Sequence, residues 1–380
     1  MFLEFNEEQL ELRESARATL SRQCPPSLVR AVADGTGDAA ELETEIGWLG
    51  WPALTIDVDV GGLGRGFAEL AVVLEELGRA AAPGSFLPTT TQFVPVVREA
   101  GTAAQAHRFL AGVASGALTG TVALHESGRY EPEAVTSTAE RDGDGWLLRG
   151  HKQHVLGAPT VDEVVVAARR DAGTLGLFVV PAAELTFKRT DSIDATRSLA
   201  NVELNGVWVP DARMLGEPDE DAGRVLTRAL GEATVGLALD ALGACSALLD
   251  ISLAVAVEGR AAGQAVEHAL ADMLVAIELA RAATYQAVAA LADGDDRAGM
   301  AASVAKAAIS RCQRLVTRHS LELRGAHDGA GELDVQLWVG RVKADDLLFG
   351  GAIDHRRMVA DRLLSTRRAR SSQLVSALLG

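Results

Sequence analysis

Three features of this chain could by themselves indicate a chemical function: its cysteines, its histidines and a glycine-rich turn. Cys24, Cys245 and Cys312 are too few and too far apart for a disulfide framework or a zinc motif. The eight histidines are scattered, and none has ligand-like spacing with a cysteine. The run GGLG at residues 61–64 does not follow a strand, so it predicts a tight turn between helices rather than a phosphate-binding loop. We therefore expect neither a metal site nor a nucleotide loop.

Composition narrows the classes of function. The 380 residues include 52 acidic and 36 basic side chains, a net charge of −16, which disfavours binding to nucleic acid or to an anionic membrane. The early acids and the lack of long apolar runs predict neither a signal peptide nor a membrane span. With so few cysteines, we expect a reducing, cytoplasmic location. The locally basic stretch RRMVADRLLSTRRAR is either a solvated helix end or a phosphate contact.

The hydrophobic pattern divides the chain into three stretches and predicts a multidomain α+β protein. Residues 1–118 have helical periodicity, and Asn6 with Gln9 resembles a capping pair at the first helix. In AELAVVLEELGRA, the apolar positions fall on one helical face. We expect an N-terminal all-α domain over this stretch.

The middle stretch, residues 119–216, contains eight short β-rich runs separated by turn signals. The sequence DGDG at residues 142–145 and the pair Asn205-Gly206 are hairpin markers. Short strands with such turns are typical of a small antiparallel barrel or sandwich, and we predict an antiparallel β-barrel domain.

Residues 217–380 return to helices that are rich in alanine. Helices are expected at 221–256, 264–292, 298–326 and 334–350, with a final one near 355–377. Long helices joined by short breaks predict a C-terminal four-helix bundle of up-and-down topology.

The order of these stretches and several segments resemble the acyl-CoA dehydrogenase family over essentially the whole chain. The segments are IGWLGWPALTIDVDVGGLGRGFAELAVVLEELGRAAAPGSFLPTT, TVALHESGRYEPEAVTSTAERDGDGWLLRGHKQHVLGAPTVDEVVVAAR, LANVELNGVWVPDARMLGEP and ALADMLVAIELARAATYQAVAAL. The nearest likeness is to the actinobacterial branch that handles fatty or steroid side-chain acyl-CoA thioesters.

The resemblance implies α,β-dehydrogenation of an acyl-CoA thioester with flavin adenine dinucleotide (FAD). A carboxylate removes the α-proton, the flavin accepts a hydride from the β-carbon, and hydrogen-bond donors hold the thioester carbonyl. It further implies that the flavin lies between the β domain and the helices, and that a neighbouring subunit completes its site.

The base implied by the family has no direct counterpart here. Where many members carry a glutamate near the C-terminus, this chain has Phe349, which cannot accept a proton. Another branch carries the glutamate on the first long helix of the bundle, at Ala233 in this chain. Glu232 is adjacent to that position and Asp240 lies two helical turns further on. The resemblance therefore offers Asp240 and Glu232 as candidate catalytic residues, with solvent-facing or salt-bridged acids as the alternative.

The flavin-binding positions of the β domain are altered. His125, Glu126 and Ser127 match a threonine-glutamate-proline motif, so that His125 replaces a flavin-binding threonine. His154 and Leu156 match the tryptophan and threonine of a second flavin motif. Both histidines are equally well explained as polar residues at the mouth of a barrel.

The stretch that family members offer to the neighbouring subunit's flavin is shortened. Arg260 matches a pyrophosphate-binding arginine one position out of register, and several residues near it are missing. Arg324 and Gly325 match the start of the glycine pair that faces the adenine half.

Three hypotheses follow. The chain is one subunit of a heteromeric acyl-CoA dehydrogenase with a paralogous partner, or a self-sufficient homo-oligomer. Alternatively, it is a flavin-free protein of the same fold, acting as a scaffold or a thioester-binding subunit. The acyl chain stays open among sterol side-chain, branched fatty and aromatic thioesters.

Overall fold

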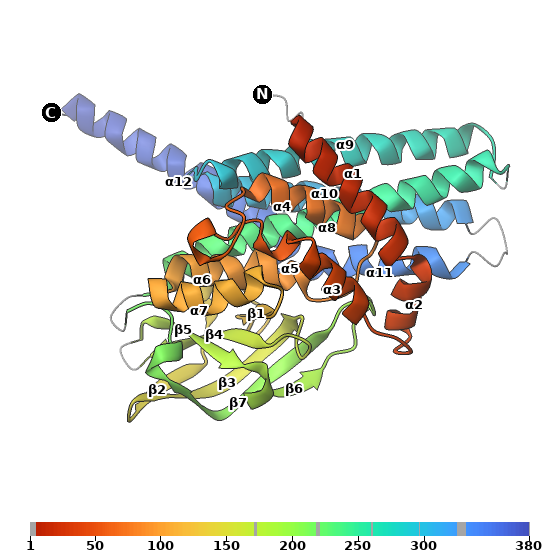
Figure 1. The fold of residues 1–380 in the computed structure, drawn as a ribbon. Coiled ribbons are helices and arrows are strands. Elements are labelled where there is room, and N and C mark those ends of the chain that lie inside the picture. The colour runs from red at the N-terminus through yellow and green to blue at the C-terminus, as the bar shows by residue number, and fades with distance from the viewer. Residues whose placement is uncertain are drawn as a thin grey trace.

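The computed structural model describes residues 5–170, 173–217, 221–259, 261–295, 297–324 and 332–379. A sheet from the middle of the chain lies on one side, and helices from both ends of the chain cover it (Figure 1). The C-terminal helix extends away from the body (Figure 1). The architecture is thus helical at both ends with a sheet between them, as the sequence predicts.

The first part of the chain forms more helices than the periodicity predicts. Helix α1 (Glu7–Gln23) begins with the expected capping box, in which the Asn6 side chain accepts from the Gln9 amide and the Gln9 side chain accepts in return. The remaining elements of this part are α2 (Pro26–Ala33), α3 (Ala40–Trp48), α4 (Phe67–Arg79), α5 (Phe86–Pro88), the π-helix η3 (Thr89–Phe93), α6 (Val94–Ala100) and α7 (Ala103–Ala114). The sequence pattern did not indicate α2, α3 or the run from α5 to α6.

The middle of the chain forms a curled mixed sheet, and the expectation of a closed antiparallel barrel is corrected. The strands are β1 (Gly120–Ala123), β2 (Thr138–Asp142), β3 (Gly145–Leu156), β4 (Glu163–Arg170), β5 (Leu175–Pro181), β6 (Thr186–Arg189) and β7 (Leu199–Pro210). Their order is β1-β4-β2-β3-β7-β6, and β5 pairs with the other side of β4. Both β1 and β2 run parallel to β4, so these pairings cannot come from hairpins. Among the described strands, no pairing joins β5 to β6, so the sheet does not close into a barrel.

Only one of the two expected hairpins forms. Strands β2 and β3 meet in a tight turn with Asp142 opposite Gly145, as predicted. The pair Asn205-Gly206 instead lies inside the continuous strand β7. There the register shifts against β3 and Gly206 has a φ of +79°, so the pair forms a β-bulge and not a hairpin turn.

The C-terminal helices lie close to the predicted ranges. They are α8 (Gly223–Val257), α9 (Gln264–Ala292), α10 (Ala298–Arg324), α11 (Glu332–Leu347) and α12 (Ala352–Leu379). Helix α10 packs along α8, α9 and α12, and α11 packs on α8. The final helix predicted near 355–377 is also present, as α12, and follows a short turn after α11.

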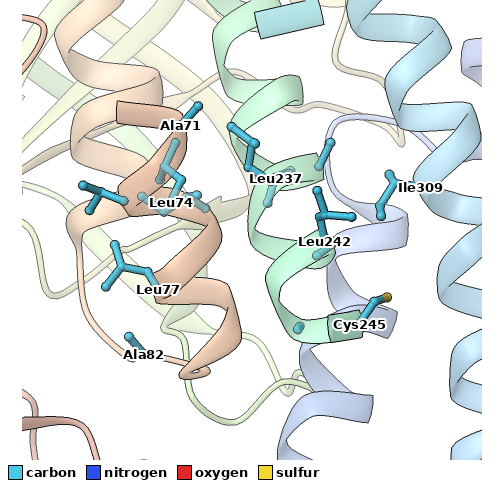
Figure 2. Packing of buried hydrophobic residues seen from close by; sticks show 14 of the residues in the cluster. Ala71, Leu74, Leu77, Ala82, Leu237, Leu242, Cys245 and Ile309 are labelled. Carbon is cyan, nitrogen blue, oxygen red and sulfur yellow. The ribbon is translucent and has the colours of Figure 1, made fainter. Parts of the chain in front are cut away.

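Helices α4 and α8 cross at the centre of the molecule and share one hydrophobic core (Figure 2). Apolar side chains from both helices, such as Leu74 and Leu242, are fully buried. A Cβ atom on Gly243 would lie 1.9 Å from the Glu75 carbonyl oxygen, and one on Gly78 would lie 2.0 Å from the Asp240 carbonyl oxygen. The backbones therefore touch at two glycines, and α4 is buried on most of its surface rather than on one face.

Two helices of the described chain, α8 and α9, are long and apolar enough to cross a membrane by length and composition alone. The most apolar window of α8 is 61% buried inside the protein. The corresponding window of α9 is 39% buried, and core helices of other proteins have the same length and composition, so these two features alone do not identify a membrane span.

Replacing Gly243 with alanine should destabilise the protein by about 3 kcal/mol, because the new methyl group meets backbone rather than a movable side chain. The matched control is Gly299→Ala in α10, where a Cβ atom meets no atom within 4 Å. That change should stabilise the helix by up to about 1 kcal/mol. Urea unfolding of both variants checks the pair, and equal effects would contradict the proposed contact between α4 and α8.

Candidate functional site

A cavity of about 610 Å³ lies between the sheet and the C-terminal helices. One wall comes from the loop after β1, which contributes His125, and from the end of β3, which contributes His154 and Leu156. A second wall is the 190–199 segment that joins β6 to β7, and the third is the end of α11 with the turn into α12. The volume is in the usual range for a small-molecule site. Three of the eight residues predicted to hold flavin therefore meet in one cavity.

His154 reaches the cavity because strand β3 is irregular at this point. The β3–β7 register shifts between Lys152 and Val155, and His154 has a φ of +51°. The His154 amide donates to the side chain of Asn201 at 3.1 Å, while the neighbouring Gln153 amide donates to the His125 carbonyl at 2.9 Å. A bulge of this kind redirects a side chain, and here it turns His154 toward the end of β1.

His125 follows β1 and lies against His154 and Tyr130. The Nδ1 atoms of His125 and His154 are 3.3 Å apart, and the His125 and Tyr130 ring centroids are 4.2 Å apart. A tight turn in which Ser127 and Gly128 both have positive φ folds Tyr130 back onto His125. Burial, with help from His154, lowers the pKa of His125, and burial raises that of Tyr130 to about 12. Both side chains are therefore uncharged near neutral pH.

Phe349 lies in the α11–α12 turn, between the lining residues Leu348 and Gly350, and contacts Tyr130. Its ring centroid lies 5.1 Å from that of Tyr130, and its φ is +58°. The ammonium group of Lys306 donates to the Asp345 carbonyl and, at 2.9 Å, to the Leu348 carbonyl. His355 Nε2 lies 3.0 Å from the Phe349 carbonyl oxygen, and burial lowers the pKa of His355 to about 4. Two buried side chains thus hold this turn in place.

Backbone strain concentrates at this cavity. Among the described residues, the non-glycine positions with positive φ are Ala81, Ser127, His154 and Phe349. His154 and Phe349 line or border the cavity, and Ser127 lies in the turn that positions Tyr130. Such conformations persist only where surrounding contacts impose them, and they cluster at functional sites.

Glu126 and Ser127 are near the cavity but do not line it. Glu126 forms a buried ion pair with Lys152 and accepts hydrogen bonds from the amide and hydroxyl groups of Thr136 and Ser137. Burial by itself would raise the pKa of Glu126, but these partners lower it to about 2. Burial lowers the pKa of Lys152 to about 8 in spite of its partner. These contacts give Glu126 a structural role, which ties the loop after β1 to β3.

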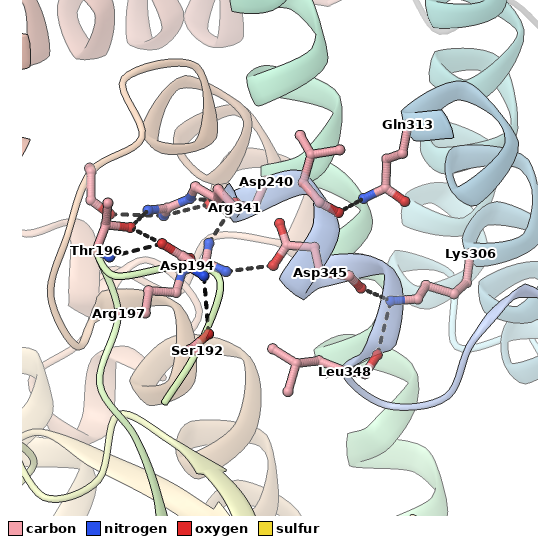
Figure 3. Close-up of polar contacts among 12 residues, drawn as sticks. Ser192, Asp194, Thr196, Arg197, Asp240, Lys306, Gln313, Arg341, Asp345 and Leu348 are labelled. Carbon is pink, nitrogen blue, oxygen red and sulfur yellow. Dashed lines mark hydrogen bonds and ion pairs between the residues drawn. The ribbon is translucent and has the colours of Figure 1, made fainter. Parts of the chain in front are cut away.

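Asp240 does not line the cavity. It is 1% exposed and forms two hydrogen bonds with Arg341, at 2.9 and 3.0 Å, and an ion pair with Arg197 at 2.5 Å (Figure 3). Burial alone would raise the pKa of Asp240, but the two guanidinium groups outweigh it and hold the pKa well below its usual range. Such a carboxylate is a weak base, so its contacts favour the salt-bridged alternative.

Glu232 also lies away from the cavity. Its carboxylate pairs with Arg98 of α6, and its side chain is 12% exposed. Burial raises the pKa of Glu232, against the effect of Arg98. Glu232 is not among the residues that line the cavity with His125 and His154. The assignment of either acid as the base stays a prediction.

Of the three residues expected to serve a neighbouring subunit, Arg324 is among the described residues. Arg260 and Gly325 lie outside them, and Arg324 is the last residue of α10. Arg314 of α10 lines the cavity, and Arg324 is ten residues further along the helix, which corresponds to about 15 Å. The structure therefore does not bring the backbone of Arg324 to the same cavity as His154.

Comparisons with known protein families show which family this chain belongs to. Residues 6–117 match the acyl-CoA dehydrogenase N-terminal domain, and residues 222–364 match the C-terminal domain. The chain belongs to the acyl-CoA dehydrogenase family, whose members are oxidoreductases.

Relatives and solved structures agree with this assignment. The mitochondrial short-chain specific acyl-CoA dehydrogenase of Bos taurus is 27% identical, covering 97% of this chain and 92% of that protein. A Tcur3481–Tcur3483 steroid ACAD variant is 31% identical with a TM-score of 0.83, covering 95% of this chain and 99% of that one. Butyryl-CoA dehydrogenase from Megasphaera elsdenii, 21% identical with a TM-score of 0.86, shares the fold, covering 96% and 100% of the two chains.

The cavity can be tested against FAD, the cofactor of this family. His154, His125 and Leu156 offer flat or apolar surfaces that suit a flavin ring. A diphosphate needs cations or free N–H donors, yet the lining carries four aspartates, Asp191, Asp194, Asp346 and Asp354. The lining arginines are already paired, Arg197 with Asp240 and Asp345 and Arg314 with Asp346. The described residues of this chain therefore fit the ring but not the complete dinucleotide.

Sequence reasoning did not assign several residues that shape the cavity, including Tyr130, Arg197, Lys306, Asp345 and Asp346. Arg197 contacts Asp345 across 148 positions of sequence, and Lys306 contacts Leu348 across 42. No local pattern marks such pairs. For Tyr130 a signal existed, since it directly follows the matched motif.

Lowering the pH should cost stability through Glu126. Its folded pKa of about 2 is below the unfolded value of 4.5, so its stabilising effect is present above pH 4.5 and is lost as the pH falls toward 2. Glu126→Gln should weaken this dependence, whereas Glu140→Gln on the exposed part of β2 should preserve it. Thermal unfolding as a function of pH checks this, and identical profiles for the wild type and Glu126→Gln would contradict it.

Asp240→Asn should destabilise the protein by about 3–5 kcal/mol, because two buried guanidinium groups lose their charged partner. Glu232→Gln should change stability by less than about 1 kcal/mol, because burial already disfavours the charged form. Urea unfolding separates the two variants. An Asp240→Asn protein of unchanged stability whose enzyme complex is inactive would instead identify Asp240 as the base.

Proposed function

We propose that this chain is one subunit of a heteromeric acyl-CoA dehydrogenase. The complex would catalyse α,β-dehydrogenation of an acyl-CoA thioester with FAD, and the partner would be a paralogous chain of the same family. In this proposal the partner supplies the carboxylate base and a complete flavin site. This chain keeps the family's fold and contributes the surface on which the partner assembles.

The observation that carries the proposal is the chemistry of the cavity wall. Phe349 occupies the matched position of the base, and Asp240 and Glu232 are both engaged by arginines away from the cavity. The cavity has aspartates where a diphosphate would need cations. A self-sufficient enzyme would require a free base and phosphate contacts from these same residues.

The comparisons support a paired assembly. The steroid ACAD that is 31% identical carries two chain names, Tcur3481 and Tcur3483. The ChsE4–ChsE5 complex from Mycobacterium tuberculosis, 22% identical with a TM-score of 0.83, has the same fold. We infer that a steroid acyl-CoA thioester is the first substrate to test.

The cysteines support a reducing compartment. Cys24, Cys245 and Cys312 are all buried, and none of them forms a disulfide bond. We infer a cytoplasmic location, as expected for proteins whose cysteines stay reduced.

The flavin content of the purified protein tests the proposal. The chain purified alone should be colourless, and co-expression with a paralogous acyl-CoA dehydrogenase chain from the same genome should yield a complex with flavin absorbance bands and dehydrogenase activity. A yellow, active protein from this chain alone would contradict the proposal and support a homo-oligomeric enzyme. Colourless protein in every combination would contradict it as well and support a flavin-free scaffold.

A further inference from the structure

Helix α9 has an apolar face that the rest of the described chain does not cover. The residues at positions 271, 274, 275, 278, 279 and 282 are all exposed, and this spacing places them on one side of the helix. Five of the six are apolar, and Leu274, Val275 and Leu279 are 50%, 58% and 69% exposed. The opposite side is apolar as well, with Met273 and Ile277 buried in the core. A helix that is apolar on both sides is normally covered on both.

Acidic side chains lie around this face. Glu278 is exposed within it, Asp272 is exposed beside it, and Glu267 is exposed one turn before it. Arg281 contacts Glu278 at 3.2 Å but also pairs with Glu75 of α4. The surroundings of the apolar residues are therefore net negative, which disfavours contact with an anionic membrane and with the same face of another α9. A helix that covers this face should be both apolar and basic.

Helix α12 has this character. It packs along α10, yet Leu363 and Leu364 are 57% and 54% exposed, and the exposed Arg356 lies two turns before Leu363 on the same side. Over its full length the helix contains six arginines and two aspartates, in a chain whose net charge is −16. It extends away from the body of its own chain (Figure 1). The exposed residues of α9 and α12 are thus complementary, but they do not cover one another within one described chain.

We propose that α9 is an interface for a second copy of this chain, whose α12 packs along it. The leucines of α12 would lie on the apolar face of α9, and the arginines of α12 would face the acids around it. Each copy offers one α9 and one α12, so a two-fold axis makes the same contact twice and closes the assembly at two copies. The contact does not require the paralogous subunit. It is compatible with the heteromeric enzyme proposed above, in which it would join two copies of this chain.

The mass of the chain in solution tests the interface. Sedimentation equilibrium of the chain purified alone should show a dimer. Leu279→Glu should raise the dissociation constant at least about tenfold, because the new carboxylate must lose its water on association. The matched control is Val58→Glu in the short 3-10 helix η2 (Val58–Val60), where the side chain is also 69% exposed. A monomeric chain, or a dimer that Leu279→Glu leaves unchanged, would overturn the proposal.

Salt tests the contribution of charge. Raising the salt concentration about tenfold should raise the dissociation constant at least about threefold, because salt screens the attraction between arginines and carboxylates. Asp272→Asn should reduce this salt dependence, whereas Asp59→Asn, at an exposed acid before α4, should not. A dissociation constant that does not rise with salt would contradict the pairing of α9 with a basic helix.

A mixture of two variants identifies the occupant. Leu364→Glu on α12 should weaken the dimer, as Leu279→Glu does on α9. In a mixed dimer of the two variants, the unchanged α12 of one copy meets the unchanged α9 of the other. The mixture should therefore associate more tightly than either variant alone. A Leu364→Glu chain that still forms the normal dimer, or a mixture no tighter than the separate variants, would overturn the role of α12.

These measurements need neither flavin nor the paralogous chain. Self-association can therefore fail while co-expression still yields a yellow, active complex, and the proposed function can fail while the dimer forms. A dimeric contact through α9 that appears only after the paralogous chain is added would overturn the second copy as the occupant.

Discussion

A buried group of ionic side chains joins the sheet to the helical bundle. Arg197 comes from the segment between β6 and β7, Asp240 from α8, and Arg341 and Asp345 from α11. Arg341 also donates to Thr196 and to the Ala82 carbonyl, so the group reaches the end of the α4 region (Figure 3). Buried charges are tolerable only when all partners are present. The relative position of β6–β7, α8 and α11 therefore depends on this group.

The same group of ionic side chains lowers the positive charge that the cavity lining can offer to a ligand. Arg197 lines the cavity, yet both of its terminal nitrogens are directed to Asp240 and Asp345. Burial raises the pKa of Asp345 to about 7, while the pKa of Asp240 stays low beside its two arginines. Burial lowers the pKa of Lys306 to about 8. Its ammonium group donates to the carbonyl of Asp345 in the last turn of α11 and to that of Leu348, just after the helix. The stabilising cations are thus inside the protein, and the cavity keeps aromatic rings and carboxylates.

The residues that hold the central helices together differ from those that line the cavity. The contacts of α4 with α8 depend on Gly78 and Gly243 and on the apolar side chains around them, none of which takes part in the cavity wall. The butyryl-CoA dehydrogenase at 21% identity and the steroid ACAD variant at 31% identity have TM-scores of 0.86 and 0.83 with this chain. Because different residues form the core and line the cavity, the cavity lining can change while the fold is preserved.

The sequence by itself determined the features that depend on neighbouring residues. Apolar periodicity placed α8 to α12 within a few residues, Asn6 and Gln9 marked the first helix start, and DGDG at 142–145 marked a true hairpin. These signals are local, because helix faces, caps and tight turns involve residues a few positions apart.

Only the tertiary structure decided the rest. Strand β4 pairs with β1, β2 and β5, and the Asn205-Gly206 turn signal gave way to a bulge because β7 pairs with β3 on both sides of it. The sequence left Asp240 open between a catalytic base and a salt-bridged acid, because its partner Arg341 is 101 positions away. Contacts at such separation leave no local pattern. Whether a carboxylate is a base or half of an ion pair is therefore settled only when the chain has folded.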